Sequence, residues 1–172
     1  MKYVSHCLIG LGLALSINAV YAADVQVAVA SNFSKPLEEI ATKFKAASGH
    51  DLKISAGATG KLYAQVENGA PFEVFISADS KTPKKLVEAN LAQADSQFTY
   101  AFGNLVLWSS QADLVDDKGE VLKSDKFKHL AVANPKTAPY GTAAMEVLDK
   151  LQLTETLSPK FVQGENITQT YD

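Results

Sequence analysis

Residues 24–40 read DVQVAVASNFSKPLEEI, and this stretch decides the fold. The apolar run over residues 25–30 predicts a strand covered on both faces, as in a parallel sheet, and an amphipathic helix is expected to follow it. Ser31 and Asn32 stand at the entrance of that helix, where several backbone N–H groups lack intrahelical partners. Such a junction can hold an anion, although Ser and Asn are also ordinary helix caps.

The helix is expected to start at Asn32 or Ser34 and to stop at Gly49. Its inward face is predicted from apolar residues at 3.6-residue spacing: Leu37, Ile40, Ala41, Phe44 and Ala47. The same order of elements returns in residues 51–67, where a predicted strand leads through a small-residue turn into a short helix.

A third unit follows, with a predicted strand over residues 74–77 and a helix begun at Thr82-Pro83. Three strand-to-helix units in succession predict an α/β fold with a mostly parallel sheet. Residues 98–108 form a long β-prone run, which we interpret as the crossover into a second domain. Beyond it we expect strands over residues 130–133 and 161–163, with a helix after each.

We therefore predict two α/β domains, each a mostly parallel sheet flanked by helices. The expected boundaries are a signal peptide over residues 1–22, a first domain over 23–102 without its returning C-terminal part, and an incomplete second domain over 103–172. The last residues read as the first turns of a helix, so we expect a chain that is truncated at its C-terminus.

The signal peptide is predicted from Lys2, the apolar run that follows it and a small-residue exit at Ala22. The apolar run is too short to span a bilayer. Cleavage after Ala22 would remove Cys7, the one cysteine, and would exclude disulfides, thiolate metal sites and cysteine nucleophiles from the mature chain. This leader points to a periplasmic protein.

Charge and motifs exclude several functions. There is no arginine, and removing Lys2 from the 16 basic residues leaves 15 against 19 acids, a net charge of −4 that makes a nucleic-acid partner improbable. His50 and His129 lack metal-ligand spacing, and adjacent carboxylates such as Asp116 and Asp117 read as a solvated face. Gly60-Lys61 fails the phosphate-loop pattern, and no nucleophile elbow or zinc motif occurs. No catalytic residue is predicted.

Four pieces of sequence, in this order, carry a resemblance to a known family. They are ASNF at 30–33, SAGATGKLY at 55–63, NGAPFEVFISAD at 68–79 and NPKTAPYG at 134–141. With them the chain resembles the periplasmic molybdate-binding proteins of ABC transporters, which have the type II periplasmic-binding-protein fold. The resemblance covers the mature sequence from about Asp24 to its end.

The resemblance implies an oxyanion held between two domains by hydroxyls and backbone N–H groups. By position, these would come from Ser31 and Asn32, Thr59, Tyr140 and Ile167. The chain departs from the commoner pattern at Ala58 and Thr59, where many relatives carry consecutive serines. No metal ion would be coordinated directly, because molybdate is held through its oxygens, and no cofactor is expected.

The expected function is capture of molybdate, and of tungstate with it, by a monomer that delivers the anion to an ABC permease. The alternatives are a carrier of sulfate, phosphate or ferric ion, or an extracytoplasmic enzyme or sensor domain on the same fold. Phosphate carries a proton at neutral pH and needs a nearby acceptor, and Glu165 and Asp79 lie close enough in sequence to leave that question open.

Overall fold

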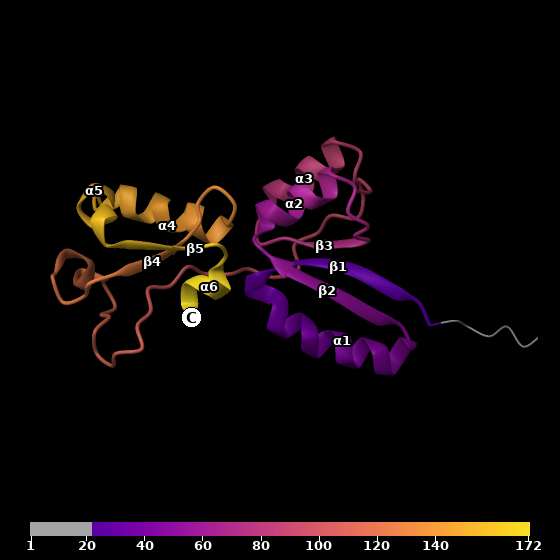
Figure 1. Cartoon of the computed structure of the whole chain (residues 1–172), viewed down its shortest axis with the longest axis horizontal. Coiled ribbons are helices and arrows are strands. Elements are labelled where there is room, and N and C mark those ends of the chain that lie inside the picture. Colours follow the sequence, from indigo (N-terminus) through magenta and orange to yellow (C-terminus); the bar gives the residue numbers. More distant parts are fainter. Residues whose placement is uncertain (1–21) are drawn as a thin grey trace, which may run out of the picture.

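The computed structural model describes residues 22–172, so the predicted signal peptide lies outside the described residues except for its last position. Figure 1 shows two groups of elements joined by a connection that crosses between them. Every strand pair within both groups is parallel, which confirms the predicted α/β class. The domain boundary at residues 102 and 103 remains a prediction.

The first group contains a three-stranded sheet of order β2-β1-β3. Its strands are β1 (Asp24–Ala30), β2 (Asp51–Gly57) and β3 (Val74–Ile76). Its helices are α1 (Ser34–Ser48), which a 3-10 turn (Ser31–Phe33) precedes, α2 (Thr59–Glu67) and α3 (Lys81–Glu88). Figure 1 shows α1 on one face of the sheet and α2 and α3 on the other.

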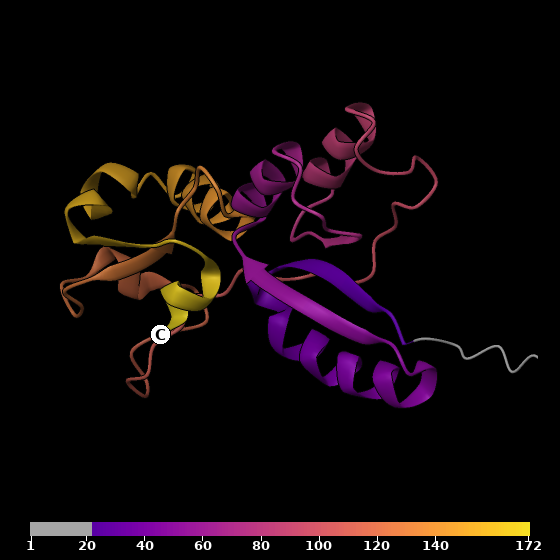
Figure 2. The same cartoon turned by 45° about the vertical axis from the view of Figure 1, so that its right-hand side comes forward.

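The second group is built on the two-stranded sheet β4-β5. The strands are β4 (Leu130–Ala133) and β5 (Phe161–Gly164). The helices are α4 (Pro139–Lys150), α5 (Thr154–Leu157) and α6 (Ile167–Tyr171), with 3-10 turns at Glu120–Lys123 and Ser158–Lys160. In the view of Figure 2, turned by 45°, the two groups still lie side by side with the connection between them.

Strand register brings the carboxyl ends of the strands together in each sheet. Ala30 at the end of β1 lies opposite Gly57 at the end of β2, and Ala133 of β4 lies opposite Gly164 of β5. In parallel sheets ligands bind beyond these ends, where the strand-to-helix turns gather. The turns that carry the predicted site residues are at these ends.

Two apolar clusters form the cores of the two groups. The first contains Val27, Val29 and Leu37, which join β1 to α1. The second contains Leu122, Leu148 and Leu157. A third, smaller cluster of Ala58, Ala133 and Ala138 takes its residues from both groups, and Ile167 packs against it. The two groups therefore meet through small side chains next to the carboxyl ends of the strands.

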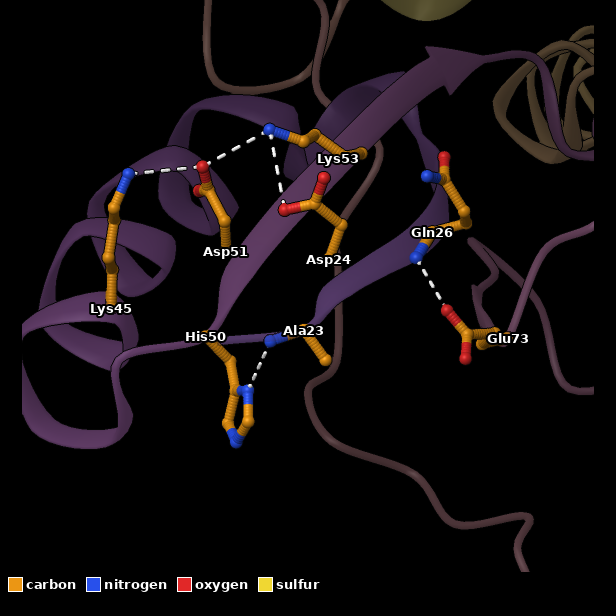
Figure 3. Close-up of polar contacts among 8 residues, drawn as sticks. All are labelled: Ala23, Asp24, Gln26, Lys45, His50, Asp51, Lys53 and Glu73. Atoms are coloured by element: carbon orange, nitrogen blue, oxygen red, sulfur yellow. Dashed lines mark hydrogen bonds and ion pairs between the residues drawn. The ribbon is translucent and has the colours of Figure 1, made fainter. Parts of the chain in front are cut away.

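The opposite end of the first sheet carries a network of exposed charges (Figure 3). The Asp51 carboxylate accepts from Lys45 Nζ at 3.0 Å and from Lys53 Nζ at 3.2 Å, and Lys53 also lies 3.6 Å from Asp24. The bonds from Lys45 and Lys53 hold the pKa of Asp51 below its ordinary value, and the bond to Asp51 raises the pKa of Lys53. Both shifts favour the charged forms.

Two further bonds in Figure 3 lie at the same end of the sheet, at β1 and the residue before it. Ala23 N–H donates to His50 Nδ1 at 2.9 Å. Gln26 N–H donates to Glu73 Oε2 at 2.9 Å and links β1 to the turn before β3.

The predicted inward face of α1 is wrong in part. Leu37 is buried, whereas Ile40 is 47% exposed and Phe44 is 38% exposed. Within the described residues β2 is an edge strand. The outer part of the helix face therefore reaches beyond the sheet and has no strand to cover it.

The β-prone run over residues 98–108 forms no strand in the part of the chain that the structure describes. It is an extended connection between the two groups (Figure 1). Strand residues need a neighbouring strand to satisfy their N–H and C=O groups, and β propensity alone does not supply one. Side chains still anchor the run, since the Tyr100 ring lies 4.8 Å from the Phe33 ring and Leu107 packs on the second core.

Candidate functional site

Each predicted site residue lies at or next to the start of a helix or helical turn. Ser31 and Asn32 open the 3-10 turn before α1, and Thr59 is the first residue of α2. Tyr140 is the second residue of α4, and Ile167 is the first of α6. Backbone N–H groups in a first helical turn lack intrahelical acceptors and carry the positive end of the helix dipole.

The structure brings all five of these residues to one pocket. Its lining consists of Ala30, Ser31, Asn32, Gly57, Ala58, Thr59, Ala78, Ala138, Pro139, Tyr140 and Ile167. The cavity volume is about 10 Å³, which is room for about one water molecule. Because the lining comes from the strand ends of both sheets, the pocket lies between the two groups of elements.

No charged side chain is among the residues that line this pocket. The polar groups that they offer are hydroxyls, one side-chain amide and backbone N–H and C=O groups. A site of this kind binds through fixed dipoles, and it holds no counter-charge that must be desolvated when a ligand enters.

The orientation of the Thr59 hydroxyl is fixed by one hydrogen bond. Thr59 is 1% exposed, and its Oγ1 accepts from Ala78 N–H at 3.2 Å. Because the oxygen is used as an acceptor, its own proton is free for a second partner. Thr59 is therefore a buried hydroxyl that can donate to a ligand in the pocket.

Two hydrogen bonds hold the groups together beside the pocket. Gly60 N–H donates to Thr137 C=O at 2.8 Å, and a Cβ atom at position 60 would lie 3.1 Å from the Thr137 backbone. Thr168 Oγ1 donates to Ser31 C=O at 3.3 Å. Gly60 thus lets the start of α2 approach the loop that precedes α4.

The start of α4 is held close to the end of β4. Pro139 occupies the first turn of the helix, where it costs no hydrogen bond. A side chain at the buried Gly141 would overlap Ala133 C=O. Only glycine allows this approach, which brings Tyr140 to the pocket.

Tyr100 supports the pocket without lining it. Its hydroxyl donates to Ser77 C=O at 3.1 Å, next to the lining residue Ala78. Burial, and to a lesser extent the nearby Tyr140, raise the pKa of Tyr100. Both effects keep the phenol protonated at neutral pH, so it acts as a donor.

The two carboxylates that sequence left in question do not line the pocket. Asp79 accepts from Thr82 N–H at 2.7 Å and from Thr82 Oγ1 at 3.1 Å, so it closes the turn before α3. Glu165 forms an ion pair with Lys61 of α2, which joins the two groups outside the pocket. Neither acid is aimed at a ligand.

Sequence reasoning did not assign six of the lining residues to the site, namely Ala30, Gly57, Ala58, Ala78, Ala138 and Pro139. None of them has a polar side chain, so no chemical signal marks them. Their positions after predicted strands were the available signal, because small residues there let a ligand approach the backbone.

Within residues 22–172 no group of three or more His, Cys, Asp or Glu side chains could hold a metal ion. Over the same residues no helix has the length and apolar character needed to cross a membrane.

The comparisons with known proteins agree with this geometry. A family model described as bacterial extracellular solute-binding protein matches residues 25–172. The molybdate-binding protein ModA of Azotobacter vinelandii is 52% identical over 168 residues, which are 98% of this chain and 67% of that protein. ModA of Rhodobacter capsulatus is 51% identical over 162 residues, or 94% of this chain and 63% of the relative.

A solved structure, the Azotobacter vinelandii periplasmic molybdate-binding protein, has a TM-score of 0.83 and 43% identity, and the match covers 86% of this chain and 64% of that one. The chain thus spans about two thirds of the length of its relatives, 63% to 67% for the two curated ones. It belongs to the family of bacterial extracellular solute-binding proteins.

Proposed function

We propose that this protein captures molybdate, and tungstate with it, in the pocket between the two groups of elements. The observation that carries the proposal is a pocket formed by helix starts from both groups and lined by no charged side chain. The choice of molybdate is supported by relatives at 52% and 51% identity that are named molybdate-binding proteins.

The donors suit a tetrahedral dianion. Ser31, Asn32, Thr59 and Tyr140 offer side-chain donors, and the first-turn N–H groups, that of Ile167 included, offer fixed donors at the positive ends of helix dipoles. A hydrogen bond to a charged group contributes about 1.5–3 kcal/mol net. Several such bonds are enough for submicromolar binding, which needs more than about 8 kcal/mol.

Phosphate is a less favoured ligand, because no carboxylate lines the pocket. At neutral pH phosphate often keeps a proton and needs an acceptor such as a carboxylate, whereas molybdate, tungstate and sulfate offer acceptors only. The two nearby acids, Asp79 and Glu165, bond to Thr82 and Lys61 and do not line the pocket. Sulfate stays the competing ligand, because it differs from molybdate in size and not in hydrogen-bonding pattern.

The wider role follows from the family. We propose that the protein acts as a periplasmic monomer, exported by the predicted signal peptide, and delivers its anion to the permease of an ABC transporter. Closure of the two groups around the anion would mark the loaded form. An enzyme or sensor role is less favoured, because these relatives are named as binding proteins and no catalytic constellation was predicted.

The test is calorimetric titration of the full-length protein with sodium molybdate, tungstate, sulfate and phosphate, and with ferric citrate. We expect submicromolar dissociation constants for molybdate and tungstate, much weaker binding of sulfate, and none of phosphate or ferric ion. Thermal shift at saturating anion is the second readout, because a ligand that binds the native state raises Tm. Absence of stabilisation by molybdate would refute the proposal.

A further inference from the structure

Gly103 belongs to residues 98–108. Figure 2 shows the extended connection that crosses between the two groups. A Cβ atom built at this position would overlap the hydroxyl of Tyr140 and lie 3.5 Å from its Cζ atom. These are the two atoms within 4 Å that such a Cβ would meet, apart from the chain neighbours. The absence of a side chain at Gly103 therefore leaves room for one group, the tip of the Tyr140 ring.

Conformation does not require glycine at this position. Among residues 22–172 the glycines in the left-handed region are Gly49, Gly69 and Gly119, and Gly103 is not one of them. Alanine could adopt its backbone angles without strain. Space for the Tyr140 hydroxyl is thus what glycine provides.

The same connection also holds a second phenol near the pocket. Tyr100, three residues before Gly103, packs on Phe33 with ring centroids 4.8 Å apart and donates to Ser77 C=O. The connection therefore lies against the Tyr140 hydroxyl, and the Tyr140 backbone is in the first turn of α4.

We propose that Gly103 is a positioning residue, which sets where the Tyr140 hydroxyl lies in the pocket and thereby tunes anion affinity. The proposal rests on the proposed function, since Tyr140 is one of the residues that would contact the anion. It adds that the segment joining the two groups shapes the ligand site directly, although Gly103 does not line the pocket.

The test is Gly103→Ala in the full-length protein, alone and combined with Tyr140→Phe. The added methyl displaces the tip of a side chain and not backbone, so the fold should survive. We expect molybdate affinity to fall about 10-fold or more, the loss of one hydrogen bond to a charged group. In the Tyr140→Phe background the same change should alter affinity less than about twofold, because the displaced hydroxyl is already gone.

A spectroscopic readout makes the test independent of binding. With tyrosines labelled at Cζ, Gly103→Ala should shift the Tyr140 NMR resonance in the unliganded protein, and Asn104→Ala should leave it in place. If the parent protein binds no molybdate, the proposed function fails, and this shift alone still decides whether Gly103 positions the hydroxyl.

Two results would overturn the inference. One is an equal loss of affinity in both backgrounds, which would mean that alanine acts by stiffening the connection. The other is an unmoved Tyr140 resonance. If Gly103→Ala fails to fold, recovery of folding by added Tyr140→Phe supports the overlap, and lack of recovery counts against it.

Discussion

The two ends of the first sheet differ in chemistry: one carries charged side chains, and the other carries uncharged hydrogen-bonding groups. At the amino ends of β1 and β2, Asp24, Lys45, Asp51 and Lys53 pair with one another in solvent (Figure 3). At the carboxyl ends of the same strands, the lining of the pocket includes the starts of helices and contains no charged side chain. Charge is thus abundant where the surface meets water and excluded where an anion is proposed to bind.

This difference explains how a protein without arginine can bind an anion. Exposed ion pairs are screened and contribute little. Fixed N–H donors at helix starts keep their geometry without an anion, so they lose little entropy when one arrives. Each substitution below changes one end of the sheet or the contact between the groups. Its effects on molybdate affinity and on the stability of the fold are measured separately.

The largest effect is expected from a negative charge in the pocket. Asn32→Asp is nearly isosteric and stands in the 3-10 turn just before α1, where a carboxylate suits the helix dipole, so Tm should be unchanged or slightly raised. At roughly 5 Å and an effective dielectric constant of about 20, repulsion costs about 3 kcal/mol per unit of anion charge. Molybdate affinity measured by calorimetry should fall at least about 100-fold.

Lys53→Gln is the matched control for that substitution. It also lowers the net charge by one, but at the far end of the sheet, where Lys53 pairs with Asp51 and Asp24. Affinity should change less than about twofold at physiological salt, because charges separated by more than a Debye length are largely screened. A comparable loss in both variants would mean that net charge, and not the pocket, governs binding.

A smaller effect is expected from removing a donor. Thr59→Val keeps the shape but removes the hydroxyl that accepts from Ala78 N–H and is free to donate into the pocket. Molybdate affinity should fall about 10- to 100-fold, the value of one hydrogen bond to a charged group. Tm should also fall, since Ala78 N–H loses its acceptor.

Thr59→Ser separates the hydroxyl from the methyl group. It should keep most of the affinity, and any change in the ratio of molybdate to sulfate binding would report the contribution of the methyl to pocket size. Equal affinities for the valine and serine variants would exclude the Thr59 hydroxyl as a ligand donor.

Local structure was predictable from the sequence to a greater extent than contacts between distant segments. Strand-to-helix junctions follow from local pattern, so Ser31, Asn32 and Thr59 could be recognised as helix-start donors from sequence. That Tyr140 and Ile167 meet them across two sheets came from the resemblance, because periodicity carries no information on contacts between distant segments. The hydrogen bond from Ala78 N–H to Thr59 Oγ1 also joins distant segments, so the local pattern does not predict it.

The wrong part of the predicted α1 face and the absence of a strand in the β-prone run have a common physical cause. The pattern of α1 marks Ile40 and Phe44 as apolar-face residues, and residues 98–108, which we interpreted as a crossover, have the composition of a strand. Burial and pairing each need a partner surface, which a local pattern does not specify. Within the described residues that partner is absent at both places, and so the side chains and the backbone stay uncovered.

A modest effect is expected from the ion pair that joins the two groups. Lys61 and Glu165 are 51% and 53% exposed, so the pair should contribute little to folding. Because it connects α2 to the loop before α6, its contribution should appear in the closed, liganded form. Lys61→Met or Glu165→Gln should weaken molybdate binding about two- to fivefold, with the loss disappearing at high salt.

The charge-swapped pair, Lys61→Glu with Glu165→Lys, is the control. It should recover most of the affinity that either single reversal loses. If the two single losses add without any recovery in the swap, the residues act separately and do not form a contact that favours closure.

The smallest effect is expected at the charged end, from Asp51→Asn. Because Lys45 and Lys53 lower the pKa of Asp51 in the folded state, its stabilising contribution is complete above the ordinary value of 3.8 and is lost as pH falls through the lowered pKa. At pH 7 the variant should melt at most a few degrees lower, and the two proteins should converge at pH values below the lowered pKa of Asp51. Molybdate affinity should stay within about twofold. A larger loss of affinity would mean that the two ends of the sheet are coupled, and it would contradict the separation of roles inferred from their chemistry.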